Sequence, residues 1–381
     1  MRKFLITLVA FSLLFVPIQS FAKEEALSLD AKAAILVDAS SGKVLFQKDA
    51  DKPLPIASIT KVMTLNLIFD AVESGKLTLN EKITVSETAA GMGGSQAFID
   101  AGYDYSAEDL IKSIIIASAN DSAVAMAERL CGSEETFVSK MNQKAKELGM
   151  DNTNFENCTG LPEANHLSTA SDVAKMSIEL LKHKGYFKYS TIWMDELKHE
   201  KDGRSTELVN TNRLIRSLQG CDGLKTGSTS EAKFCVTTTA KRGDMRLISV
   251  VLGGSTSKLR FEDASKLINY GFANFENKVV VQANQVLDKE IPVKKGKDKS
   301  AQICAKEGFS VCVENSGDEK LETRLELAEF VEAPAKRGLG VGKMTVLLNG
   351  EEIGQIELVL AKDCEKASFF DRLKTIIAFW K

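Results

Sequence analysis

The sequence predicts an α+β fold, in which an antiparallel sheet with helices packed on it is followed by a small all-β domain and a C-terminal amphipathic helix. Three observations predict it. Strand-like period-2 patterns occur near the N-terminus and again at 222–252, with helical periods between them. From about Asn277 the chain consists of short strand-like segments, which is typical of a sandwich. The last residues return to a helical period.

The elements of the first domain follow in order. A hairpin is predicted where 33–38 and 43–47 flank the turn Ala39-Ser40-Ser41-Gly42, because Gly suits a tight turn. Apolar residues at helical spacing then predict helices that begin at Ser58, Ala107, Ala123, Glu134 and Val173. Further elements are predicted at 234–239 and 247–252 (strands) and 262–275 (helix). We expect the hairpin and these strands to share one antiparallel sheet that the helices cover.

The two ends of the chain differ from its middle. Residues 1–22 combine a positive start, an apolar run and a small-x-small site ending at Ala22, which predicts a secretory signal peptide. We expect an α+β domain at 23–276, a β domain at 277–364 and an amphipathic segment at 365–381. That last segment has an aromatic face and a net positive charge, so it suits a membrane interface and is too short to span. We therefore expect an exported protein that is held at the outer face of a membrane.

Composition argues against several classes of function. Hydrophobic residues make up 44% and charged residues 27% of the 381 residues, as in soluble globular proteins. The net charge of −3 becomes −5 without the two positive charges of the signal peptide, so nothing favours nucleic-acid binding. The seven Cys lack the spacing of metal ligands, and we expect no metal and no cofactor. Cys304 and Cys312 flank a predicted hairpin turn at 306–308 and could face each other; burial as small apolar residues is the alternative.

A candidate nucleophile stands at Ser58. Lys61 follows three positions later, so on a helix the hydroxyl and the amine would share a face. The start of a helix also offers unpaired N–H groups for the oxyanion that forms when a serine attacks a carbonyl. The motif alone is weak, because Ser-x-x-Lys occurs five times, at Ser20, Ser40, Ser58, Ser230 and Ser255. Only Ser58 begins a long amphipathic helix, and an ordinary N-cap with a solvated lysine is the alternative.

Two further motifs make the pattern specific. Ser118-Ala119-Asn120 occupies the gap between two predicted helices and is the only Ser-x-Asn of the chain. Lys225-Thr226-Gly227 begins a predicted core strand and is the only Lys-Thr-Gly. The order and context of the three motifs match those of active-site serine acyltransferases. The joint match is far more specific than any one motif.

With these motifs the chain resembles the low-molecular-weight penicillin-binding proteins of the D-alanyl-D-alanine carboxypeptidase type. The resemblance covers nearly the whole mature chain and includes Met92-Gly93-Gly94-Ser95-Gln96, Thr159-Gly160-Leu161-Pro162 before His166, and Leu259-Arg260-Phe261. It implies the fold of the serine β-lactamases and penicillin-binding proteins, followed by the β domain and an anchoring helix. The implied reaction removes the terminal D-alanine from peptidoglycan stem pentapeptides, and the implied inhibitors are β-lactams. The implied location is the outer face of the cytoplasmic membrane, in the periplasm or on the cell-wall side.

The resemblance also implies roles for the site residues. Ser58 would attack the carbonyl between the two D-alanines, and Lys61 would act as base once burial and the nearby Lys225 had lowered its pKa. Ser118 would relay the proton to the leaving amine, and Asn120 would hold the substrate amide and orient Lys61. The remaining implied contacts are the carboxylate-binding Thr226 and Arg260, the substrate-binding Lys225 and Gly227, and oxyanion-binding N–H groups of Ser58 and Ser228.

Two departures from the family pattern affect substrate preference and deacylation: Ala119 stands where many members have Gly, and Ser228 where some have His or Tyr. A class A β-lactamase would need Glu-x-x-x-Asn, and Glu163-Ala164-Asn165 offers only Glu-x-Asn. A D,D-endopeptidase and a non-catalytic peptidoglycan-binding protein are further alternatives. The predicted partners are peptidoglycan stem peptides, β-lactam antibiotics and a membrane surface, without nucleic acid.

Overall fold

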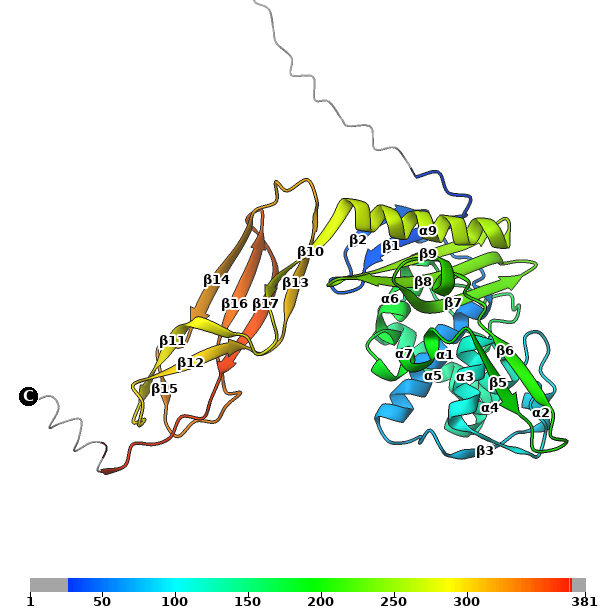
Figure 1. Ribbon diagram of the computed structural model, residues 1–381, viewed down its shortest axis with the longest axis horizontal. Coiled ribbons are helices and arrows are strands. Elements are labelled where there is room, and N and C mark those ends of the chain that lie inside the picture. The colour runs from blue at the N-terminus through cyan, green and yellow to red at the C-terminus, as the bar shows by residue number, and fades with distance from the viewer. Residues whose placement is uncertain (1–26, 370, 372–381) are drawn as a thin grey trace, which may run out of the picture.

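The structure is a computed structural model that describes residues 27–369 and 371. The predicted signal peptide lies outside the described residues, and so does most of the predicted C-terminal helix. Figure 1 shows a larger part, in which helices surround a sheet, and an elongated part made of strands. Within the described ranges, no helix is both long and apolar enough to cross a membrane.

A five-stranded antiparallel sheet with the order β2-β1-β9-β8-β7 forms the centre of the larger part. Its strands are β1 (Ala33–Asp38), β2 (Val44–Lys48), β7 (Cys221–Thr229), β8 (Lys233–Arg242) and β9 (Met245–Gly254). The predicted single sheet is confirmed, because the N-terminal hairpin joins the later strands through β1 and β9. In that pairing Ile35 lies opposite Val250.

Both faces of this sheet are buried, which explains why β1 and β9 are apolar at consecutive positions. Ile35 and Val250 belong to the core under most of the helices, whereas Leu36 and Val251 belong to a second core. Helix α9 (Ser257–Asn274) covers the second core and lies across the sheet in Figure 1. The α+β prediction for this part is therefore confirmed.

Most of the other helices lie on the opposite face of the sheet and carry most of the site. They are η1 (Ala57–Thr60), α1 (Lys61–Glu73), α2 (Glu87–Ala90), α3 (Ala107–Ile116), α4 (Asn120–Cys131), α5 (Glu134–Glu147), α6 (Ala170–Leu180), η2 (Lys184–Tyr186) and α7 (Phe187–Ser190). The short helix α8 (Leu214–Ser217) instead packs in the second core through Leu214. Polar side chains begin several of them; for example, the hydroxyl of Ser106 accepts a hydrogen bond from the N–H of Asp109 at 3.1 Å. Two small hairpins complete this part, β3 (Lys82–Thr84) with β4 (Asp104–Ser106) and β5 (Met194–Lys198) with β6 (Ser205–Val209).

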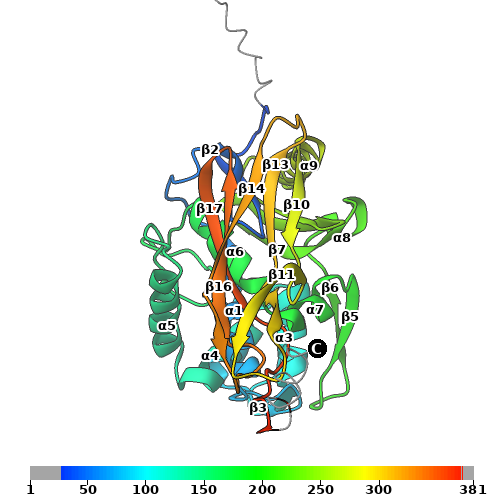
Figure 2. The ribbon, with the colours of Figure 1, turned by 90° about the vertical axis from the view of Figure 1, so that its left-hand side faces the viewer.

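The part of the chain after α9 consists of two sheets around a separate apolar core. The strands are β10 (Phe275–Val281), β11 (Val286–Lys294), β12 (Ser300–Ala305), β13 (Phe309–Glu314), β14 (Leu321–Leu327), β15 (Val331–Glu332), β16 (Gly340–Leu348) and β17 (Glu351–Leu360). β10 pairs with β13, and the others form a six-stranded sheet with the order β14-β16-β17-β12-β11-β15. Figure 2 shows these strands in front of the helical part. The predicted all-β sandwich is confirmed.

Three local expectations were wrong. The helix predicted to begin at Ala123 begins at Asn120, because the turn after α3 is shorter than the polar sequence suggested. The helix predicted at 262–275 begins at Ser257, because the side chain of Thr256 caps it there. Cys304 and Cys312 do not face each other across a hairpin, since β12 pairs with β11 and β17 whereas β13 pairs with β10. The segment 306–308 crosses from one sheet to the other. All seven cysteines lie within the described residues, and none of them forms a disulfide.

Candidate active site

The side chains of Ser58 and Lys61 meet where η1 passes into α1. The Nζ atom of Lys61 lies 3.2 Å from the Oγ atom of Ser58. Lys61 is completely buried, and its amine also donates to Oδ1 of Asn120 at 2.5 Å and to the carbonyl of Thr159 at 2.7 Å. Asn120 and Thr159 lie 59 and 98 positions away from Lys61 along the chain, so distant segments hold the amine. Its remaining side faces the serine.

Burial determines the protonation of this lysine. It lowers the pKa of Lys61 from 10.5 to about 7, although the charges of Cys158 and Asp121 act in the opposite direction. Burial also lowers the pKa of Lys225 well below its usual value, and repulsion from Lys61 and Arg260 adds to the effect. A lysine with a pKa near 7 is neutral about half of the time at neutral pH, as a general base must be.

A glycine-containing loop seats Asn120 at the start of α4. Its Nδ2 atom donates to the carbonyl of Gly93 at 2.7 Å, and its backbone N–H donates to the carbonyl of Ser95 at 2.7 Å. Gly94 has φ +80°, and a Cβ atom there would lie 2.7 Å from Nδ2 of Asn120. The Met92–Gln96 motif of the sequence thus turns the amide oxygen of Asn120 toward Lys61.

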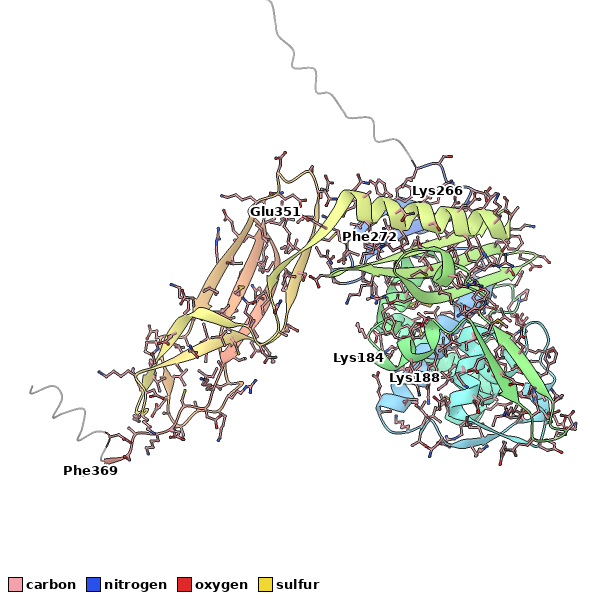
Figure 3. The ribbon with its side chains drawn as sticks, viewed as in Figure 1. Lys184, Lys188, Lys266, Phe272, Glu351 and Phe369 are labelled. Carbon is pink, nitrogen blue, oxygen red and sulfur yellow. The ribbon has the colours of Figure 1, made fainter. Side chains whose placement is uncertain are left out.

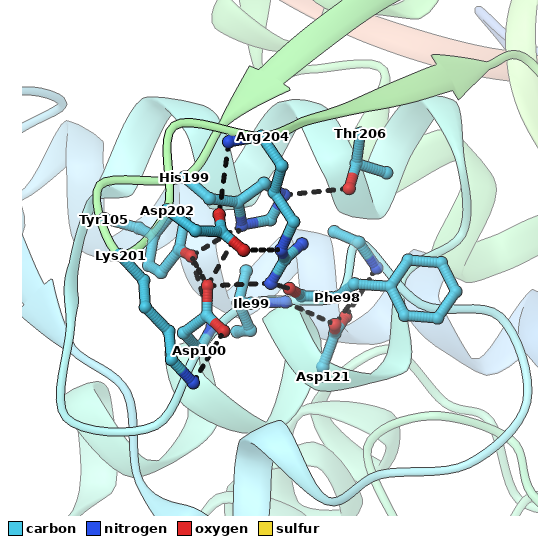
Figure 4. A network of polar contacts seen from close by, with 11 residues as sticks. Phe98, Ile99, Asp100, Tyr105, Asp121, His199, Lys201, Asp202, Arg204 and Thr206 are labelled. Carbon is cyan, nitrogen blue, oxygen red and sulfur yellow. Dashed lines mark hydrogen bonds and ion pairs between the residues drawn. The ribbon is translucent and has the colours of Figure 1, made fainter.

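The next residue, Asp121, fixes the continuation of that loop (Figure 4). Its buried carboxylate accepts hydrogen bonds from the N–H groups of Ala97 at 3.0 Å and Ile99 at 3.2 Å. Arg204, from the β5–β6 hairpin, then pairs with Asp100 at 2.8 Å. The hairpin and the loop therefore brace the start of α4 from the outside.

Ser118 lies between α3 and α4 with a positive φ of 64°, a backbone conformation that is strained for a residue other than glycine. Its side chain is 3% exposed, and among the described residues its Oγ atom has no hydrogen-bond partner. Buried hydroxyls are normally paired, so this one is free to serve a bound ligand. The strained backbone indicates that the position of the hydroxyl matters.

The loop after Cys158 contributes contacts that the sequence did not assign. Thr159 supplies a carbonyl to Lys61, and Gly160, with φ +84°, packs against the start of η1. A Cβ atom on Gly160 would lie 1.9 Å from the carbonyl oxygen of Ala57 and 2.9 Å from the N atom of Ser58. The Thr-Gly-Leu-Pro motif was the available signal for these two residues, but nothing local showed which atoms they would meet.

His166, which ends that loop, helps to fix η1. Its Nδ1 atom accepts from the N–H of Glu156 at 3.1 Å, so Nε2 carries the proton and donates to Oγ1 of Thr60 at 2.7 Å. Burial lowers the pKa of His166 to about 4, which keeps the ring neutral near pH 7. Its role is thus to hold Thr60, and within the described residues its ring makes no hydrogen bond to Ser58 or Lys61.

Strand β7 forms the opposite wall of the site. A Cβ atom on Gly227 would lie 2.7 Å from the carbonyl oxygen of Ile56 and 2.9 Å from the N atom of Ser58, so only glycine lets the strand approach this closely. Lys225 is 2% exposed, and the hydroxyl of Thr226 donates to that of Thr211 at 2.8 Å. Ser228 is exposed at the end of this wall.

Arg260 reaches the same strand from α9. One of its terminal nitrogens donates to the carbonyls of Gly227 at 3.0 Å and Cys235 at 3.1 Å, and burial lowers its pKa to about 10. Its Nε atom is buried and has no partner among the described residues. Arg260 therefore supports β7 and places a positive charge behind this strand. The sequence had suggested a role in substrate binding for Arg260 and had not predicted this support of the strand.

Together these residues form an arrangement suited to nucleophilic acyl transfer. A hydroxyl stands beside a buried amine of lowered pKa, and a strand and a helix start offer backbone N–H groups next to it. A cavity of about 370 Å³, lined in part by Ala57, Gly160 and Thr229, adjoins the serine on one side. Glu163, the glutamate of the Glu-x-Asn segment, is exposed and is one of the residues that line that cavity.

Comparison with known proteins agrees with this geometry. A family model described as D-alanyl-D-alanine carboxypeptidase matches residues 19–256, and one described as the C-terminal domain of penicillin-binding protein 5 matches residues 275–366. The D-alanyl-D-alanine carboxypeptidase DacF of Bacillus subtilis is 40% identical over 100% of this chain and 99% of its own. DacC of Escherichia coli is 36% identical over 96% of this chain and 92% of its own.

Solved structures give the same result. A peptidoglycan synthesis regulatory factor from Streptococcus pneumoniae superposes with a TM-score of 0.74 at 28% identity, covering 89% of this chain and 100% of that one. Penicillin-binding protein D2 from Listeria monocytogenes, solved in its ampicillin-bound form, gives 0.58 at 35% identity over 65% of this chain and 99% of that one. On these grounds the chain belongs to the D-alanyl-D-alanine carboxypeptidase family.

Proposed function

We propose that this protein is a serine-type D-alanyl-D-alanine carboxypeptidase that removes the terminal D-alanine of peptidoglycan stem pentapeptides and is acylated by β-lactams. The observation that carries the proposal is the buried Lys61 amine, held by Asn120 and Thr159 and turned toward Ser58. A solvated lysine beside an N-cap would be protonated and could not act as base. This lysine has its pKa lowered by burial to about 7.

The mechanism follows from the contacts. The neutral amine of Lys61 takes the proton of Ser58, whose oxygen attacks the carbonyl between the two D-alanines. The N–H groups of Ser58 and Ser228 stabilise the oxyanion, and the unpaired hydroxyl of Ser118 passes the proton to the leaving amine. Water then hydrolyses the ester on Ser58.

The other residues bind the substrate. Asn120 holds the substrate amide, while the Thr226 hydroxyl and the charge of Arg260 attract the terminal carboxylate. Lys225 lies buried beside them, and Gly227 lets the strand lie close to the backbone of Ile56 and Ser58. The 880 Å³ cavity next to Thr211 and Arg260 lies on this carboxylate side.

The experiment is the intact mass of the protein after incubation with benzylpenicillin, followed by an assay of D-alanine release from a pentapeptide. We expect one stable adduct and D-alanine release, both abolished by Ser58→Ala. Ser40→Ala is the matched control, because Ser40 also precedes a lysine by three residues. Rapid return of the free mass with hydrolysed drug would indicate a β-lactamase, and no adduct with no release would indicate a non-catalytic binding protein.

We further propose that a signal peptide at 1–22 exports the protein. The catalytic domain is then 23–276, and the β domain is 277–364. Residues 365–381 attach the protein to the outer face of the cytoplasmic membrane. Ser368 and Asp371 exchange the hydrogen bonds of a capping box, which supports a helix starting here. Phe369 is 74% exposed and lies at the end of the β domain away from the catalytic domain (Figure 3). Co-sedimentation with anionic vesicles, with and without 365–381, tests the attachment.

A further inference from the structure

The carboxylate of Asp121 is completely buried at the start of α4, one residue after Asn120. It accepts hydrogen bonds from the N–H groups of Ala97 at 3.0 Å, of Ile99 at 3.2 Å and of Ser122 at 2.8 Å. Within the described residues these backbone groups are its only hydrogen-bond partners, and no basic side chain forms an ion pair with it. The fold therefore holds an acidic group in the interior without a cation, next to the residue that orients the general base.

Phe98 lies between two of these donors and has a strained backbone. Its φ is 58°, which is costly for a bulky residue, and its side chain is 55% exposed, so packing of the ring does not explain the strain. A residue in this conformation turns neighbouring N–H groups toward one point, which is the geometry of a backbone nest for an anion. The N–H groups of Ala97 and Ile99 meet in this way on Asp121 (Figure 4). The strain at Phe98 therefore serves to hold an anion at this position.

The charge of Asp121 acts on the buried amine of Lys61. It raises the pKa of Lys61 against the effect of burial, while Lys61 and Lys225 repel each other. The other titratable neighbours of this amine carry no negative charge near pH 7. Burial raises the pKa of the Cys158 thiol well above its usual value, and the ring of His166, with a pKa of about 4, is neutral. Asp121 is therefore the anion that offsets positive charge at the general base.

The outer side of Asp121 faces the loop and the β5–β6 hairpin, where no charge is left over. Burial lowers the pKa of His199, so its ring is neutral near pH 7. The charged residues here pair with one another, as Arg204 does with Asp100 at 2.8 Å and with Asp202 at 3.2 Å. The field of Asp121 is therefore balanced by the site and not by the hairpin.

We propose that Asp121 is a positioning residue of the acylation step, which seats Asn120 beside Lys61 and supplies a buried negative charge that stabilises the ammonium form of this amine. The inference rests on the proposed carboxypeptidase function and adds no step to it. The proton moves from Oγ of Ser58 to Nζ of Lys61 while the Oγ–C bond to the substrate forms, so the amine is charged during acylation. A buried ammonium without an opposing charge is costly, and Asp121 lowers that cost.

The test is the pH dependence of acylation by a fluorescent penicillin in Asp121→Asn, which keeps the shape of the side chain and removes its charge. We expect the inflection near 7 to move down by about 1 unit, because the charge that raises the pKa of Lys61 is gone. The rate above the inflection should fall about 3- to 10-fold, because the ammonium loses its stabilisation.

Arg204→Gln is the matched control. Arg204 donates to the carbonyl of Phe98 at 2.9 Å, so this variant loosens the same loop from outside and leaves the charge of Asp121 in place. It should lower the rate without moving the inflection. An inflection that stays near 7 in Asp121→Asn, or one that moves equally in Arg204→Gln, overturns the proposal.

A pair of variants at Phe98 tests the nest while Asp121 stays intact. Phe98→Gly accepts the positive φ and Phe98→Val does not, so the valine variant should be acylated at least about 5-fold more slowly and with a displaced inflection. Urea unfolding checks that each variant folds. If Asp121→Asn does not fold, this pair decides, and equal rates and inflections in the two variants overturn the proposal. A native protein that penicillin does not acylate overturns the proposed function itself and is thus distinguishable.

Discussion

Replacing Asn120 by aspartate places a negative charge directly on the general base. The amide oxygen of Asn120 accepts the hydrogen bond from the Lys61 amine at 2.5 Å, and an aspartate oxygen of nearly the same shape would replace it. The variant Asn120→Asp therefore tests whether the lowered pKa of Lys61 sets the rate of acylation. Asn120→Ser is the matched control, because both variants lose the hydrogen bond to the carbonyl of Gly93 and only one adds a charge.

The size of the effect follows from the separation. A charge within about 4–6 Å shifts a pKa by about 1–3 units, and at 2.5 Å the upper part of that range applies. The pKa of Lys61 would rise from about 7 to about 9–10. At pH 7 the neutral fraction of the amine would then fall from about one half to between about 1 in 100 and 1 in 1,000. We expect acylation at pH 7 to slow by about 50- to 500-fold.

The assay is the second-order rate constant for acylation by a fluorescent penicillin between pH 5.5 and 10.5. In the native protein this rate should rise with pH through an inflection near 7, because only the neutral amine can take the proton of Ser58. In Asn120→Asp the inflection should move to about 9–10, with the rate recovering at high pH. Asn120→Ser should be slower at every pH without that displacement. An inflection that stays near 7 in Asn120→Asp would refute the role of Lys61 as the titrating base.

Two further predictions concern the loop that supports Ser58. Gly160→Ala should slow acylation at least about 100-fold and lower the free energy of unfolding by about 2–4 kcal/mol, because the added Cβ atom would overlap the carbonyl of Ala57. Gly75→Ala is the control. Gly75 has φ +73° and no neighbour within 4 Å, so this variant should show the effect of backbone strain alone. Urea unfolding measures the free energy of unfolding, and penicillin binding measures the rate of acylation. Equal losses of stability and of acylation rate in the two variants would contradict the steric argument. His166 has a folded pKa of about 4, below its usual 6.5, so its contribution is complete above pH 6.5 and is lost as the pH falls toward 4. We expect up to about 3 kcal/mol to be lost over that interval, and His166→Gln should flatten the pH dependence measured by urea unfolding.

Local patterns were sufficient to predict most of the architecture. The strands of the central sheet and the helices were visible as apolar periods, because each element must bury one face whatever its neighbours are. The three motifs were also visible, since Ser58 and Lys61 are one helical turn apart and need no distant contact to share a face. The misplaced start of α4 and the false hairpin at 306–308 show the limit of such patterns. A polar turn signals that the chain bends and does not say which strand it meets next.

The sequence by itself thus determined the family, the order of the elements and the residue types of the site. Only the tertiary structure decided how they act, because the pKa of Lys61 is lowered by burial that segments far along the chain provide. The carbonyl of Thr159 and the amide of Asn120 reach it from 98 and 59 residues away. In the same way, the cavity next to Thr211 and Arg260 exists because a loop after β6 meets the start of α9. Desolvation and cavity shape depend on everything that surrounds a group, and therefore no single stretch of sequence contains them.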